Sequence, residues 1–252
     1  MSEQPEALTD APRSPGLPVW KRAIRIFAQP ADAWEGLERK VQFWIPLVLI
    51  LLMNATFAAV TYHRVLVPMM LDQWDEAVAN GQMQPEQVEK ISDFFVNNPA
   101  AVALTVGQQA VILPLVMLLI AAVLWFGCGF VLGTKFRFRL ALEVVCWASL
   151  VRIPETLITF AIAWFTETFK GIHLGLAALL PEPETPNKLH TGLAVFLDAI
   201  GPFGIWYLAV AILGASALSG APRKNVAWVL IALYLALAGL FAAVAAAFTP
   251  GA

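Results

Sequence analysis

The chain has 252 residues, of which 59% are apolar and only 13% are charged. Soluble domains carry about 25% charged residues, so this composition indicates an integral membrane protein. The net charge of −2 offers no basic footprint of the kind that nucleic acid requires, and nucleic acid is therefore excluded as an expected partner.

The N-terminal region divides into a tail and an amphipathic segment. Residues 1–17 are polar and rich in proline, without apolar periodicity or a secretory signal, which predicts a disordered cytoplasmic tail. Residues 18–40 are expected to form short amphipathic helices, the first of them over "WKRAIRIF". This helix either lies on the cytoplasmic leaflet or packs as a cap under the bundle. The candidate interfacial residues are Trp20, Lys21, Arg22, Arg25 and Phe27.

Residues 41–252 are predicted to form a membrane domain of five helical spans. A helix needs about 20 mostly apolar residues to cross the hydrocarbon core. The segments that meet this requirement are residues 44–62, 105–133, 140–165, 193–218 and 227–248. The expected fold class is therefore an all-α integral membrane protein, built as a five-transmembrane-helix bundle.

Basic residues in the short loops predict the orientation. They form three clusters: one before the first span, one between the second and third spans, and one between the fourth and fifth spans. The residues are Lys21, Arg22, Arg25, Arg39, Lys40, Lys135, Arg137, Arg139, Arg223 and Lys224. All three clusters are expected in the cytoplasm, which gives a cytoplasmic N-terminus and an external C-terminus. The acidic region between the first two spans is expected outside as a helical cap, because "MMLDQWDEAV" and "PEQVEKISDFF" have helical patterning.

The third span contains charged residues at mid-depth. Arg152 and Glu155 are three residues apart, which places them on one helix face, and Pro154 between them predicts a kink. Asn54 in the first span is expected at a similar depth in the membrane, and Asp198 in the fourth span is expected nearer the outer end, within reach of Arg152. Asn54, Arg152, Glu155 and Asp198 therefore form a candidate buried polar centre. Two interpretations remain open: a hydrogen-bonded knot that fixes helix packing, or a functional site such as an anion site, a lipid-headgroup site or a proton relay.

Other motifs are sparse. Gly129 and Gly133 in "GFVLG" form a small-xxx-small pair that, together with Pro154, predicts helix-packing positions. The sequence contains no GxSxG, HExxH or Walker motif, so an enzyme is not expected, and neither a cofactor nor a metal is predicted.

Three stretches resemble the Yip family of polytopic membrane proteins, which are named for binding Ypt/Rab GTPases in eukaryotes. The first, "IFAQPADAWEGL...QFWIPLVLILL", is similar to the family's approach to its first span. The second is "WFGCGFVLGTKFRFRLALEVVCWASLVRIPETL", and the third is "FLDAIGPFGIWYLAVAILGASALSGAPRKNVAWVL". The resemblance implies a five-helix fold with a cytoplasmic N-terminus.

The resemblance also sets expectations for function. Eukaryotic members act in early secretory traffic in complexes with small GTPases and with each other. Because the tail of this chain is short and its two amphipathic external helices resemble the bacterial branch, small-GTPase binding is doubtful as an expectation here. The expected function is that of a non-enzymatic accessory or organising subunit of the bacterial cytoplasmic membrane, which contacts lipid, another membrane protein or itself. The alternative is a small transporter or channel that uses Asn54, Arg152, Glu155 and Asp198.

Overall fold

A computed structural model describes residues 16–181 and 187–249. Every regular element within these ranges is helical. Five helical segments are long and apolar enough to cross a membrane, which confirms the predicted fold class. They are Trp44–Ala79, Pro99–Val131, Phe138–Thr166, Pro202–Ser219 and Arg223–Phe248.

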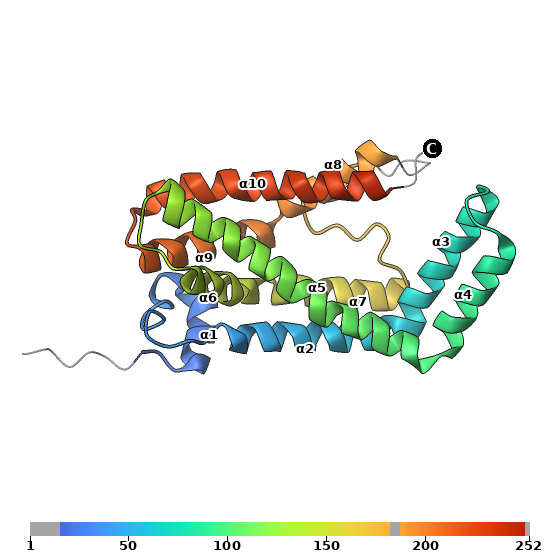
Figure 1. Cartoon of the computed structure of the whole chain (residues 1–252), viewed down its shortest axis with the longest axis horizontal. Coiled ribbons are helices and arrows are strands. Elements are labelled where there is room, and N and C mark those ends of the chain that lie inside the picture. Colours follow the sequence, from blue (N-terminus) through green and yellow to red (C-terminus); the bar gives the residue numbers. More distant parts are fainter. Residues whose placement is uncertain (1–15, 182–186, 250–252) are drawn as a thin grey trace, which may run out of the picture.

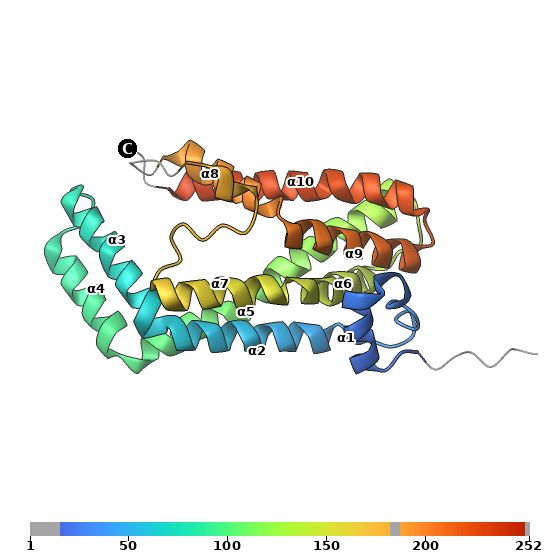
Figure 2. The same cartoon turned by 180° about the vertical axis from the view of Figure 1, so that it is seen from behind.

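The five segments form an elongated bundle with different structures at its two ends (Figures 1 and 2). Helix α1 (Val19–Ala28) lies across one end, roughly perpendicular to the long helices, and the short helix η1 (Pro30–Asp32) follows it. A hairpin of α3 (Val67–Ala79) and α4 (Pro85–Asn97) projects from the other end. We refer to these as the α1 end and the hairpin end. Of the predicted N-terminal tail, only Gly16 and Leu17 fall within the described residues.

The first span leads directly into the hairpin. Helix α2 (Trp44–Thr61) continues through the π-helical turn η2 (Tyr62–Leu66) into α3. The Tyr62 hydroxyl donates a hydrogen bond of 2.9 Å to the Phe95 carbonyl oxygen in α4. This bond ties the turn to the second helix of the hairpin and lies beside a small apolar cluster of Tyr62, Val67 and Ala101.

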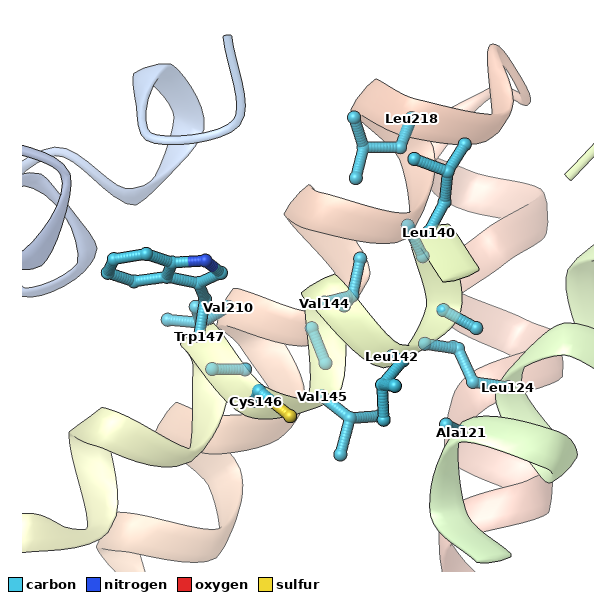
Figure 3. Close-up of a cluster of buried hydrophobic side chains, with 14 of the residues drawn as sticks. Ala121, Leu124, Leu140, Leu142, Val144, Val145, Cys146, Trp147, Val210 and Leu218 are labelled. Carbon is cyan, nitrogen blue, oxygen red and sulfur yellow. The ribbon is translucent and has the colours of Figure 1, made fainter. Parts of the chain in front are cut away.

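The centre of the bundle is α6 (Phe138–Ala148), in which every residue from Leu140 to Ala148 is buried. It packs between α5 (Pro99–Trp125) and α9 (Pro202–Ser219), and Figure 3 shows their side chains meeting around it. Because consecutive residues of a helix point in all directions around its axis, burial of the whole run means that other elements surround the helix. One of these is the N-terminal segment, because Ile26, Trp34 and Leu37 belong to the same core.

The second and third spans both change helix type. Helix α5 ends in the π-helical turn η3 (Phe126–Val131). Helix α6 passes through the 3-10 turn η4 (Ser149–Arg152) into α7 (Ile153–Thr166).

The predicted fourth span needs a correction. The sequence pattern favoured one helix over residues 193–218, whereas the structure contains two helices, α8 (Lys188–Ala199) and α9, with Ile200 and Gly201 between them. Pro202 explains the break, because a proline disfavours helical backbone at the preceding residue, and Gly201 is extended with φ −113° and ψ 173°. Helix α8 instead packs along α10 (Arg223–Phe248), near the short helix η5 (Leu176–Leu179).

Candidate functional site

The third span changes helix type immediately before Pro154. Pro154 lacks an N–H group and would leave the Leu150 carbonyl oxygen without its usual helical donor. The 3-10 turn resolves this, because the Ile153 N–H donates to the Leu150 carbonyl oxygen. The Ser149 hydroxyl donates a hydrogen bond of 2.7 Å to the Val145 carbonyl oxygen, so both of these carbonyl groups have donors other than Arg152. The guanidinium of Arg152 is therefore available for other contacts.

Arg152 and Glu155 form an ion pair within this one span. Arg152 Nε lies 2.8 Å from Glu155 Oε2, and Arg152 Nη2 lies 3.2 Å from Glu155 Oε1. Two parallel hydrogen bonds of this kind are stronger than a single contact and fix the mutual orientation. The Arg152 side chain remains 45% exposed and that of Glu155 21% exposed. The pair therefore faces open space and is not sealed in the core.

That open space is a cavity of about 590 Å³ between α2, α5 and α7, which we call the Arg152 cavity. Its polar lining consists of Asn54, Thr61, Gln109, Ser149, Arg152, Glu155, Thr156 and Thr159. Its apolar lining includes Ile50, Met53, Phe57, Leu113, Met117 and Phe160. Asn54 thus shares a cavity with the ion pair, but its side-chain amide donates 2.8 Å to the Ile50 carbonyl oxygen of its own helix.

Asp198 lies in a different arrangement. Its Oδ2 is 2.6 Å from His173 Nδ1, while its buried Oδ1 has no hydrogen-bond partner among the described residues. Asp198 lines a second cavity of about 320 Å³, and this cavity shares Arg152, Glu155 and Thr159 with the first. The four residues of the predicted polar centre therefore line two cavities that have three lining residues in common, but only Arg152 and Glu155 bond to each other. Sequence reasoning did not identify His173 as a site residue. His173 lies in the loop after α7, and its approach to Asp198 depends on the tertiary fold.

A second polar cluster lies at the α1 end, where sequence reasoning did not place a site. Glu143 is fully buried in α6. Its Oε1 accepts a 2.7 Å hydrogen bond from the Gln42 backbone N–H, and its Oε2 accepts one of 3.2 Å from Trp147 Nε1. Arg139 lies 3.8 Å from the same carboxylate and donates to the carbonyl oxygens of Leu37, Glu38 and Lys40. The i,i+4 spacing of Arg139, Glu143 and Trp147 was the available sequence signal.

Arg22 completes this cluster and departs from the predicted orientation of α1. Its residue surface is only 1% exposed, and its guanidinium donates to the carbonyl oxygens of Ala33 and Glu35 and to Gln42 Oε1. The guanidinium also lies 5.5 Å from the Trp147 ring centroid. Burial lowers the pKa of Arg22, while the carboxylates of Glu143 and Glu35 act in the opposite direction. Arg22 therefore fastens α1 to the bundle and does not face the leaflet.

The remaining interfacial candidates are divided between an exposed face of α1 and contacts with neighbouring elements. Trp20 is 61% exposed and Ile24 59% exposed, and the Lys21 ammonium lies 5.3 Å from the Trp20 ring centroid. Phe27 is partly exposed and packs edge-on against Trp206 in α9, with 5.6 Å between ring centroids. Arg25 donates to the Asp32 carbonyl oxygen. One face of α1 thus packs under the bundle, as one of the two predicted arrangements requires, and the other face is exposed, so its contact with the leaflet stays a prediction.

The predicted glycine pair is also corrected. Gly133 has φ 64° and open space where a side chain would project. The role of this glycine is therefore to allow left-handed backbone just after η3. A Cβ on Gly129 would reach Trp125 of its own segment and the Phe136 carbonyl oxygen, which is not a contact with another span. Close helix packing instead uses Gly127, whose Cβ would lie 2.6 Å from Leu233 of α10, and Gly214, whose Cβ would lie 2.6 Å from the Trp34 ring.

The chemistry available in this arrangement is binding and charge pairing. No group of His, Cys, Asp and Glu among residues 16–181 and 187–249 has the proximity needed to hold a metal ion. The Arg152 cavity combines one positive group, one negative group and an extensive apolar wall. Such a combination suits an amphipathic ligand or a partner helix with a polar residue.

Comparisons with known proteins identify the family. No curated protein and no solved structure matched the chain. The family model described as the Yip1 domain matches residues 24–246, which is well over half of the chain. Yip1 proteins are generally non-enzymatic membrane proteins, and the match includes all five candidate spans except the last residues of α10. The chain therefore belongs to the Yip1 domain family.

Proposed function

We propose that this chain is a bacterial-type Yip1 protein that acts as a non-enzymatic accessory or organising subunit. It works through contacts of its membrane domain with lipid, with another membrane protein or with a second copy of itself. Binding of a small GTPase is not part of this proposal.

The observation that carries the proposal is the placement of the Arg152–Glu155 pair. A charge pair that served only to hold helices together would join two helices. Here both side chains belong to one span and both line the Arg152 cavity, and among the described residues the two side chains form their hydrogen bonds and ion pair with each other and with no second helix. Charged residues inside a membrane are costly and are a functional site by default. The cavity is therefore the proposed contact site for a lipid or protein partner.

Purification from native membranes in mild detergent tests this role. The co-purifying proteins and lipids are identified by mass spectrometry for the wild type, for Ala58→Trp and for Ala59→Trp. Ala58 lines the cavity, whereas Ala59 is the next residue along α2 and is exposed outside it. We expect Ala58→Trp to lose a defined component that Ala59→Trp retains. A wild type that carries no defined component, or an Ala58→Trp variant that retains the full set, contradicts the proposal.

The two neighbouring cavities favour one second candidate, a small transporter or channel. Arg152, Glu155 and Thr159 line both the Arg152 cavity and the cavity at Asp198, so polar groups lie between the two spaces. Flux of protons and of small ions into proteoliposomes tests this candidate, with Asp198→Asn as the variant that alters the second cavity. Flux in the wild type that Asp198→Asn reduces supports transport, and flux no greater than in empty liposomes excludes it for those ions.

We further propose that the α1 end faces the cytoplasm of a bacterial cell. The basic turns between α5 and α6 and between α9 and α10 lie at the same end of the bundle as α1 (Figures 1 and 2). These turns carry Lys135, Arg137, Arg223 and Lys224. Positive residues in short loops remain on the cytoplasmic side, and this supports a cytoplasmic N-terminus and an external hairpin.

A further inference from the structure

We propose that the Arg152 cavity binds the zwitterionic headgroup of an aminophospholipid, with the lipid phosphate at Arg152 and its primary ammonium at Glu155. This inference rests on the proposed accessory function and names the class of ligand at its contact site. It follows from the charge of the cavity, its hydrogen-bonding capacity and its apolar walls.

The charge balance of the cavity favours a zwitterion. Arg152 and Glu155 are the charged residues in its lining, so their charges cancel. A purely anionic ligand would gain Arg152 but would lie beside the Glu155 carboxylate at a separation where like charges repel strongly. A purely cationic ligand would be attracted to Glu155 but would be repelled by the Arg152 guanidinium. A ligand with both charges satisfies both residues.

Both residues retain free hydrogen-bonding capacity. A guanidinium carries five N–H donors, and Arg152 directs one from Nε and one from Nη2 to Glu155. The Nη1 donors have no partner among the described residues and can bind phosphate oxygens. A carboxylate offers about four acceptor positions, and Arg152 occupies two of them on Glu155. The other two suit a primary ammonium, which has three N–H donors, better than a quaternary ammonium, which has none.

The walls and extent of the cavity suit the apolar part of a lipid. The aromatic pair Phe57 and Phe160 is stacked with 4.3 Å between ring centroids and lines the cavity beside Met53, Leu113 and Met117. The lining extends from Arg152 to Leu66 and Phe169 at the hairpin end. The volume of about 590 Å³ lies in the ordinary range for ligand sites, roughly 300–1,000 Å³.

The experiment measures lipid binding to the purified full-length protein by native mass spectrometry in detergent. The probes are phosphatidylethanolamine, phosphatidylcholine, phosphatidylglycerol and N-acetyl-phosphatidylethanolamine, which keeps the phosphate but loses the ammonium. We expect phosphatidylethanolamine to bind roughly tenfold or more tightly than the other three, because only it supplies charged hydrogen bonds to both residues. Equal binding of all four lipids to the wild type overturns the inference without requiring any variant.

Three variants locate the site. Arg152→Gln is expected to reduce phosphatidylethanolamine binding roughly tenfold, and Glu155→Gln is expected to abolish its preference over phosphatidylglycerol. Arg64→Gln is the matched control, because Arg64 forms a 3.0 Å ion pair with Glu167 and does not line the cavity. Wild-type affinity in Arg152→Gln, or an equal loss in Arg64→Gln, overturns the assignment to this cavity.

Two further results separate this inference from others. Soluble phosphoethanolamine that competes as well as the whole lipid overturns the lipid assignment in favour of a water-soluble zwitterion. A protein partner that co-purifies with the wild type and with Arg152→Gln alike, without any lipid preference, overturns the inference and leaves the accessory function in place. Absence of both a partner and a bound lipid contradicts the proposed function itself.

Discussion

Arg152 and Glu155 depend on each other because each supplies the opposite charge in the same cavity. Arg152→Leu leaves Glu155 without its cation, and Glu155→Gln leaves Arg152 without its anion. Each substitution is expected to destabilise the protein, and the double substitution is expected to cost less than the sum by about 0.5–3 kcal/mol. Equilibrium unfolding in detergent measures this coupling energy.

Asp198 supplies the control for that measurement. Its hydrogen bond goes to His173, so Asp198→Asn is expected to be nearly additive with Arg152→Leu and coupled to His173→Gln. Additive effects of Arg152→Leu and Glu155→Gln would show that the interaction between the two side chains contributes nothing to the free energy of unfolding.

Gly214 gives a prediction about packing. A Cβ at this position would lie 2.6 Å from the Trp34 ring, a rigid neighbour held in the core. Gly214→Ala is therefore expected to destabilise the protein by about 1–3 kcal/mol, the usual cost of overpacking. Gly239→Ala is the matched control in another span, where a Cβ meets nothing within 4 Å. It is expected to stabilise the helix by about 0.5–1 kcal/mol. Equal unfolding midpoints for the two variants would contradict this role of Gly214.

At the scale of single residues, sequence spacing predicted contacts within a helix but not contacts between elements. The pairing of Arg152 with Glu155 follows from their spacing, because three residues along a helix bring side chains together. The approach of His173 to Asp198 and the burial of Arg22 both require knowledge of loop positions. The glycine contacts were not predictable for the same reason, since a GxxxG spacing does not specify which neighbour approaches.

At the scale of an element, the periodicity of α1 predicted the helix and its apolar side but not the position of Arg22. The pattern of "WKRAIRIF" correctly predicted a helix with Trp20, Ile24 and Phe27 toward one side. It placed Arg22 with the other cations, because the carbonyl groups that bind Arg22 come from the following segment. The break between α8 and α9 did have a local signal, since a Gly-Pro pair is a common helix boundary.

The exposed face of α1 is expected to contact lipid. A spin label at Ile24→Cys, in a protein whose Cys128 and Cys146 are replaced by alanine, should be more accessible to oxygen than to a water-soluble nickel complex. The physical reason is that oxygen partitions into the bilayer, whereas the charged complex does not. A label at Asp32→Cys, which is also exposed, is the comparison and should show the reverse order. Equal nickel accessibility at the two positions would place the α1 face in water.

At the scale of the whole molecule, hydropathy was sufficient to predict five spans because span length and apolar content are local properties. The order in which the spans pack was not predictable, because nearly all of their side chains are similarly apolar. In particular, no sequence pattern indicated that α6 would be surrounded by the N-terminal segment, α5 and α9.

The proposed orientation predicts different labelling at the two ends. Gln82→Cys in the turn of the hairpin should react with a membrane-impermeant thiol reagent on intact cells. Asp32→Cys should react only after the cells are permeabilised. Both positions are exposed, and Cys128 and Cys146 are again replaced by alanine. Reaction of both positions from the same side would contradict a membrane crossing by α2, and the reverse pattern would invert the orientation.

The π-helical turn η2 makes this part of the chain tolerant of a one-residue loss. A π turn contains one more residue than an α turn, so removing a single residue between Tyr62 and Leu66 allows ordinary α-helix to form. The extra residue is absorbed within the turn, so its removal would leave α3 close to its present rotation around the helix axis, and the Tyr62 bond to α4 could be kept. A deletion inside α2 has no extra residue to remove and would rotate everything beyond it by about 100°. A one-residue deletion in η2 is therefore expected to alter the molecule less than a one-residue deletion in α2.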